Sequence, residues 1–92
     1  MDTIIVSRHP AAIEFIAREV GSEWPVLAIA TAEDVRGKHV IGNLPLHLAA
    51  LAGKVTVIEF EGAPPRGQEY SLADMDAAGA VLRSYVVDRA GR

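Results

Sequence analysis

The chain has 92 residues, of which 50% are hydrophobic and only 5% aromatic, with a formal net charge of -3. This length predicts one domain over residues 1–92 with a frayed tail at 88–92, and because so short a chain gains from partner burial, we expect a homodimer. The acidic balance argues against duplex nucleic acid as a partner, and the absence of cysteine excludes disulfides and favours the reducing cytoplasm.

The first half of the chain predicts a strand, a helix and two further strands. Thr3–Val6 is a short β-branched run, typical of a strand buried on both faces. Pro10 fits the first turn of a helix that continues to Val20 with apolar residues at helical spacing and ends at Gly21. The next predicted segments are a strand at Val26–Ala30, a loop or helical turn at Thr31–Lys38 and a strand at His39–Ile41.

The second half predicts a helix, a strand and a final helix. Leu44–Ala52 is apolar nearly all round, so this helix needs cover on more than one side. Lys54–Phe60 is β-branched and predicts a central strand, and glycine and proline predict a loop over Glu61–Gln68. A variant capping box at Ser71–Asp74 opens a last helix that runs to about Val86.

The resulting order, β-α-β-β-α-β-α, favours a compact α/β fold. We expect a Rossmann-like sandwich of three layers with a mainly parallel sheet and right-handed crossovers. Neither a dinucleotide fingerprint nor a P-loop follows any strand. No apolar stretch reaches the roughly 20 residues that cross a bilayer, and Met1–Thr3 lacks the basic start of a signal peptide. We therefore expect a soluble cytoplasmic protein with no membrane partner.

Ser7, Arg8 and His9 follow the first strand, at the carboxyl edge where α/β sheets bind ligands. Backbone N–H groups and the helix dipole favour an anion there. Arg8 adds a planar fork that suits phosphate, Ser7 a hydroxyl donor and His9 a group that moves protons near neutral pH. Together they predict a phosphate site. The alternative is that Ser7 and His9 only satisfy the turn and that Arg8 pairs with a surface acid.

The turn after the third strand repeats this arrangement at the same edge. Gly42 permits close approach of the backbone to a ligand, and Asn43 is either a ligand-binding residue or simply a good N-cap. His47 shares a helix face with Leu44 and Leu48. It is therefore either a catalytic group or a satisfied core or interface histidine.

Four more polar residues are considered as possible site residues. Arg66 lies in the loop rich in glycine and proline and either folds over a ligand or is solvated. Glu59 and Glu61 flank the end of their strand and either act as a base or simply solvate the end of the strand, and only one of them is expected to face inward. His39 begins its strand, at the opposite edge from the other two histidines, so we predict no function for it. Because three such histidines do not converge within the roughly 2.0–2.1 Å of one metal ion, no metal site is predicted.

Three longer stretches resemble, in order and spacing, the Csx-sixteen family, a small CRISPR-associated family found beside type III interference loci. The stretches are SRHPAAIEF at 7–15, VIGNLPLHLAA at 40–50 and RGQEYSLADM at 66–75. The chain departs from the family pattern at Asn43, where a threonine or serine is expected, and at Ala11, where a glycine is expected.

The resemblance implies a fold related to the CARF sensor domains and a homodimeric ring nuclease that linearises cyclic oligoadenylate, above all cyclic tetraadenylate. Such an enzyme switches off type III signalling. The chemistry needs neither metal nor cofactor, because each ribose 2′-hydroxyl can attack its own phosphate when the attack is in line and the added charge is stabilised. The expected catalytic residues are Arg8, His9 and His47. The expected ligand-binding residues are Ser7, Gly42, Asn43, Leu44 and Arg66.

Two other functions fit the same sequence. One is a binding module of this fold that captures the cyclic messenger without cutting it. The other is a dimeric interaction protein that uses the apolar helix at 44–52 and binds no nucleotide.

Overall fold

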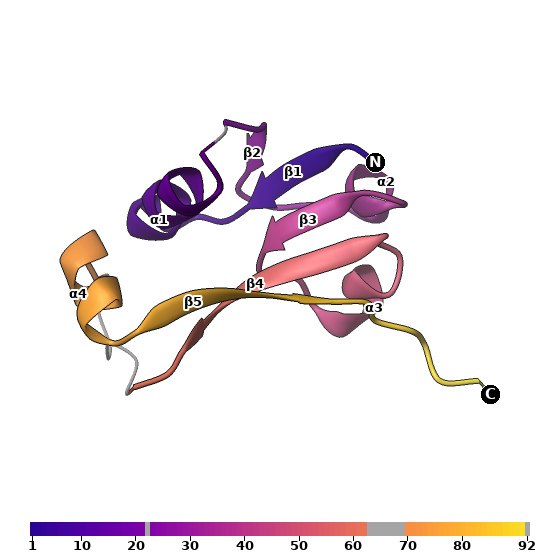
Figure 1. Ribbon diagram of the computed structural model, residues 1–92. Coiled ribbons are helices and arrows are strands. Elements are labelled where there is room, and N and C mark those ends of the chain that lie inside the picture. The colour runs from indigo at the N-terminus through magenta and orange to yellow at the C-terminus, as the bar shows by residue number, and fades with distance from the viewer. Residues whose placement is uncertain (22, 63–69, 92) are drawn as a thin grey trace.

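A five-stranded sheet forms the centre of the protein, in the order β2-β1-β3-β4-β5 (Figure 1). The computed structural model describes residues 1–21, 23–62 and 70–91. The first four strands run parallel and β5 runs antiparallel to β4, which confirms the predicted α/β class and mainly parallel sheet. The strands are β1 (Thr3–Val6), β2 (Val26–Leu27), β3 (His39–Gly42), β4 (Lys54–Phe60) and β5 (Ala80–Tyr85).

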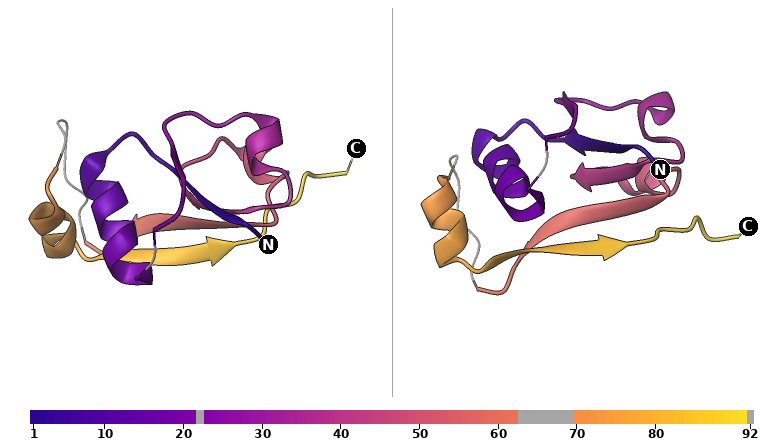
Figure 2. Two further views of the ribbon diagram at one scale, coloured as in Figure 1. Left: turned by 90° about the horizontal axis from the view of Figure 1, so that it is seen from above. Right: turned by 45° about the horizontal axis from the view of Figure 1, so that its top comes forward.

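Helices cover both faces of this sheet because alternate residues of each strand point to opposite sides. Ile4 and Val6 of β1 pack against two short helices on one face, and Ile5 packs against the long helix on the other. The long helix also contacts the last helix, and the two lie side by side in every view (Figures 1 and 2). This layering is consistent with a Rossmann-like sandwich. The helices are α1 (Pro10–Val20), α2 (Ala32–Val35), α3 (Leu46–Ala49) and α4 (Leu72–Ala77).

The prediction for the last helix is wrong beyond residue 77. The capping box at Ser71–Asp74 is present, but α4 ends at Ala77 and the chain continues as β5. Gly79, at φ 74°, makes the turn that a helix does not allow. From there β5 pairs with β4 along its whole length, so the hydrogen bonds of the sheet edge outweigh the helical spacing of the apolar residues. The predicted order β-α-β-β-α-β-α therefore lacks β5. The segment after β2, for which the sequence predicts a loop or a helical turn, forms the short helix α2.

Two other elements are shorter than predicted. The β2 strand ends at Leu27 rather than Ala30, because at the sheet edge it pairs with β1 alone. The α3 helix covers Leu46–Ala49 rather than Leu44–Ala52, since Pro45 keeps the residue before it out of the helical region. The boundaries of β1, α1 and β4 agree with the prediction.

Candidate functional site

The turns that follow β1 and β3 lie side by side at the carboxyl edge of the sheet. The two strands are parallel neighbours, and Val6 faces Gly42 in register. The backbone N–H of Asn43 donates to the Val6 carbonyl oxygen over 3.2 Å. The strand ends therefore bring both predicted turns to one place.

Two adjoining hollows lie between these turns. The first, which we name the Tyr70 hollow, has a volume of about 110 Å³ and is lined by Ser7, His9, Ala12, Ile16, Gly42, Asn43, Ile58, Phe60 and Tyr70. The second, the Arg8 hollow, has a volume of about 170 Å³ and is lined by Val6, Ser7, Arg8, His9, Ala28 and Asn43. Ser7, His9 and Asn43 line both hollows, so the structure joins five of the predicted site residues in one region.

The side chains of the first turn are available for a ligand. Ser7 Oγ accepts a hydrogen bond from the His9 backbone N–H over 3.2 Å, which satisfies the turn and leaves the hydroxyl proton free to be donated. His9 is the N-cap residue of α1 but makes no capping bond with its imidazole, which is exposed. Arg8 is also exposed and forms no ion pair with any described residue.

Gly42 is required by the sheet itself. Its φ is 138°, and a Cβ at this position would lie 1.9 Å from the Val6 carbonyl oxygen. The close approach predicted for this glycine is therefore made to the backbone of β1.

Asn43 is not the N-cap of α3. That position belongs to Pro45, which makes no side-chain capping bond. The Asn43 side chain is exposed and makes no hydrogen bond with the described part of the chain. Capping therefore does not explain this residue, and its amide is open to a ligand.

Two aromatic rings that the sequence analysis did not assign stand beside His9. The Tyr70 ring stacks on the His9 ring with centroids 6.2 Å apart and planes 24° apart. Phe60 meets Tyr70 edge to face, with centroids 6.3 Å apart. Tyr70 belongs to the third of the stretches noted above, but its place at the site depends on how α4 docks, which no local pattern reveals.

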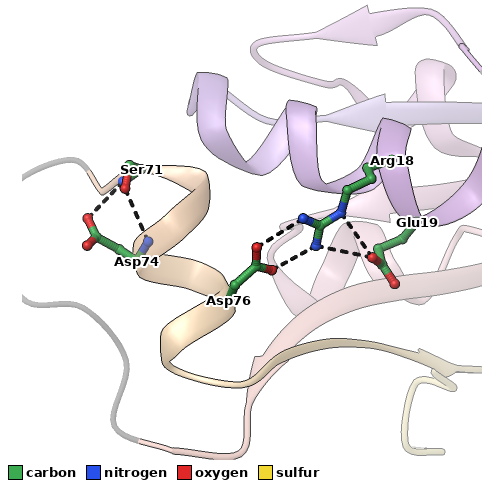
Figure 3. Close-up of polar contacts among 5 residues, drawn as sticks. All are labelled: Arg18, Glu19, Ser71, Asp74 and Asp76. Carbon is green, nitrogen blue, oxygen red and sulfur yellow. Dashed lines mark hydrogen bonds and ion pairs between the residues drawn. The ribbon is translucent and has the colours of Figure 1, made fainter.

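An ion pair between α1 and α4 holds the segment that carries Tyr70. The Arg18 guanidinium donates to both carboxylate oxygens of Asp76, over 2.7 and 3.0 Å, and also contacts Glu19 (Figure 3). The hydrogen bonds from Arg18 hold the pKa of Asp76 below its usual value. Below this pair, Met75 of α4 is fully buried against Phe15 of α1.

The other predicted site residues lie elsewhere. His47 is exposed on α3 and lines a separate groove of about 550 Å³, together with Leu46, Ala50, Leu51, Val87, Asp88, Arg89 and Ala90. Leu44 is half-buried in the core on the face of α2 and α3. Arg66 lies outside the described residues.

The two glutamates at the end of β4 face the same way. Arg83 of β5 contacts Glu59 over 3.1 Å and Glu61 over 3.2 Å, and Glu59 also accepts a hydrogen bond from the Tyr85 hydroxyl. Neither carboxylate lines the two hollows of the candidate site, so the expectation that one of them faces inward as a base is wrong. Both carboxylates pair with Arg83 of β5, an edge strand that was not predicted from the sequence.

His39 lies at the amino end of β3, opposite the candidate site, as predicted. Its Nε2 lies 2.7 Å from Thr56 Oγ1, which lies 2.8 Å from Ser84 Oγ. These three side chains link β3, β4 and β5. Partial burial, and then the nearby Lys54 charge, lower the pKa of His39.

His39 gives the fold a pH dependence. Because its pKa is lower in the folded protein than the ordinary value of about 6.5, the unfolded chain binds the proton more readily as pH falls below 6.5. We expect the free energy of unfolding to be constant above pH 7 and to fall as the pH drops through 6 toward the folded pKa. Urea denaturation at pH 7.5 and 5.5 should show a smaller loss in His39→Asn than in the natural chain, and an equal loss would contradict the assignment.

Neither a membrane span nor a metal-binding cluster is found among the described residues. None of the helices within 1–21, 23–62 and 70–91 has the length and apolar character of a membrane span. Over the same residues, no three side chains of the metal-binding types come together. The predicted absence of a metal site stays a prediction.

The chain matches a known family of proteins. Residues 4–88 match the family model described as "Putative CRISPR-associated protein (Cas_VVA1548)". Neither the comparison with curated proteins nor the comparison with solved structures gives a match. Because the family match spans nearly the whole of β1 to β5, the chain belongs to the Cas_VVA1548 family of CRISPR-associated proteins.

Proposed function

We propose that the protein is a homodimeric, metal-independent ring nuclease that linearises cyclic tetraadenylate and thereby ends type III CRISPR signalling. The observation that supports this most is the meeting of Ser7, Arg8, His9 and Asn43 around two hollows at the carboxyl edge. Because the chain belongs to a CRISPR-associated family, we choose an anionic ligand that CRISPR systems use. The proposal includes a CARF-related origin of the fold.

The reaction is an internal transfer of the phosphate ester. The ribose 2′-oxygen forms a bond to its own phosphorus, the bond from phosphorus to the 5′-oxygen breaks, and the product carries a 2′,3′-cyclic phosphate and a 5′-hydroxyl. Arg8 and the Ser7 hydroxyl hold the phosphate and stabilise its added negative charge. His9, which lines both hollows, takes the proton from the 2′-hydroxyl or gives one to the 5′-oxygen. We assign no step to His47, because it lines the separate groove.

The size of the hollows bears on how the ring is held. Volumes of about 110 and 170 Å³ are below the roughly 300–1,000 Å³ of pockets that enclose a small ligand. A cyclic tetranucleotide therefore lies across the edge, with single groups entering the hollows. A second copy related by a twofold axis would present the same edge to a ligand that has rotational symmetry of its own.

The activity is tested by incubating the purified protein with labelled cyclic tetraadenylate in excess chelator and separating the products. We expect linear products that end in a 2′,3′-cyclic phosphate, and a dimer by light scattering. An intact ring after prolonged incubation would exclude the nuclease. Tight binding without turnover would select a messenger-binding module instead.

A protein-interaction function has one observation in its favour. Leu46 of α3 is 76% exposed, beside the groove that also holds His47. If cyclic tetraadenylate neither binds nor shifts the melting temperature, this groove becomes the better candidate.

A further inference from the structure

Aromatic side chains are scarce in this chain, yet two of them gather at the candidate site. The sequence holds two tyrosines, two phenylalanines and one tryptophan. Tyr70 and Phe60 both line the Tyr70 hollow, whereas Phe15 is buried in the core and Trp24 packs beside α1. Tyr70 is only half-buried and stacks on the exposed imidazole of His9. A half-exposed stack of rings next to the hollow that Arg8 lines offers one surface for a base and another for a phosphate.

Asn43 adds a hydrogen-bonding group to the same hollow. Asn43 lines the hollow with Tyr70 and His9, and its exposed side chain is not used to cap α3. A carboxamide both donates and accepts, which matches the N7 acceptor and the N6 donor of adenine, whereas guanine presents acceptors at both positions. The volume of about 110 Å³ suits a flat base better than a whole nucleotide.

We infer that the Tyr70 hollow is an adenine subsite, in which the base stacks on Tyr70 and Asn43 reads its N6 and N7 edge. This inference rests on the proposed function, because it names the part of the ligand that enters the hollow. The phosphate then lies in the neighbouring Arg8 hollow, since Ser7, His9 and Asn43 are shared by both. Tyr70 supplies affinity that any base can use, and Asn43 supplies the preference for adenine.

The position of Tyr70 depends on α4 rather than on the strand ends. Tyr70 directly precedes Ser71, the N-cap of α4, and Arg18 and Asp76 hold α4 to α1 (Figure 3). The buried Met75 of α4 also packs against Phe15 of α1. Leu72 of α4 packs in the same apolar cluster as Tyr70 but does not line the hollow. Leu72→Ala therefore serves as a control for loosening of this helix.

The test compares the binding of AMP, GMP and ribose 5-phosphate to the full chain by NMR titration. We expect the natural chain to prefer AMP over GMP by about tenfold and the H2 and H8 protons of AMP to shift upfield from the Tyr70 ring. Tyr70→Leu should weaken AMP binding by about tenfold and leave ribose 5-phosphate unchanged, whereas Tyr70→Phe should retain the affinity. Asn43→Ala should reduce the preference for AMP to about twofold or less.

Three results would overturn the subsite. One is a loss of ribose 5-phosphate binding in Tyr70→Leu equal to its loss of AMP binding, because Tyr70 would then act through the scaffold. Another is a loss of AMP binding in Leu72→Ala as large as in Tyr70→Leu. The third is cleavage of cyclic tetraadenylate by the natural chain that neither Tyr70→Leu nor Asn43→Ala alters. If the natural chain prefers AMP but does not cleave the ring, the subsite stands and the nuclease proposal fails.

Discussion

Replacing Arg8 with alanine is expected to lower the rate of cyclic tetraadenylate cleavage by about 100-fold or more, the largest effect on activity that we predict. The transition state carries added negative charge on the phosphate, and Arg8 is the exposed guanidinium at the hollow beside Ser7 and His9. Loss of one donor to such a charge costs roughly 100- to 1,000-fold in rate. Arg8→Lys keeps the positive charge but loses the planar guanidinium. Its cleavage rate should therefore lie between those of the natural chain and Arg8→Ala.

The matched control for this variant is Arg36→Ala. Arg36 is exposed, like Arg8, but it lies at the end of α2 and contacts Glu33. The chain leads from Arg36 to the amino end of β3, opposite the candidate site. His39→Ala, at that same amino end, should also keep nearly full activity. Single-turnover cleavage rates of all three variants measure the comparison. If Arg36→Ala or His39→Ala were as slow as Arg8→Ala, the site would not be at the carboxyl edge.

Replacing Gly42 with alanine is expected to have the largest effect on stability. The new Cβ would overlap the Val6 carbonyl oxygen at 1.9 Å, and the backbone atoms of a central strand cannot move aside as a flexible side chain does. The φ of 138° adds strain for any residue with a side chain. Together these should cost roughly 3 kcal/mol or more, against a typical total of about 5–15 kcal/mol for a domain. Urea denaturation of Gly42→Ala measures the loss.

Gly21→Ala gives a reference for a positive φ without a clash. Gly21 also has a positive φ, 68°, but a Cβ there would meet no atom within 4 Å. Its substitution should cost only about 1–2 kcal/mol, the ordinary penalty of a left-handed residue. Equal losses in the two variants would contradict the predicted overlap with Val6. Any loss of activity in Gly42→Ala should therefore be interpreted together with its stability.

Local patterns in the sequence predict the elements in the middle of the fold well. The β1 strand is a continuous apolar run, α1 begins at Pro10 and ends at Gly21, and β4 is β-branched. Each of these signals acts within a few residues of the chain, so no knowledge of distant contacts is needed. The same holds for Ser7 to His9, because a turn between a strand and a helix opens at the carboxyl edge whatever the strand order.

What the sequence does not reveal depends on contacts between distant segments. The apolar residues of β5 fit helical and strand spacing alike, and only the free edge of β4 decides between them. The two hollows form because β1 and β3 are neighbours in the sheet. No local sequence pattern determines the order of the strands. For the same reason Tyr70 could not be assigned, since the docking of α4 on α1 brings it to His9.

The pairing of β4 with β5 also determines what a change of length in the segment that carries Tyr70 would cost. Phe60 faces Ala80 in register, and backbone hydrogen bonds of 3.1 and 2.9 Å extend the pairing to Glu61 and Gly62. The chain between Gly62 and Ala78 is therefore an insertion between two strands that are already joined. Lengthening such an insertion costs little entropy. A change in the length of this segment is therefore expected to move Tyr70 while β1 and β3, which lead into the turns with Arg8 and Asn43, stay in place.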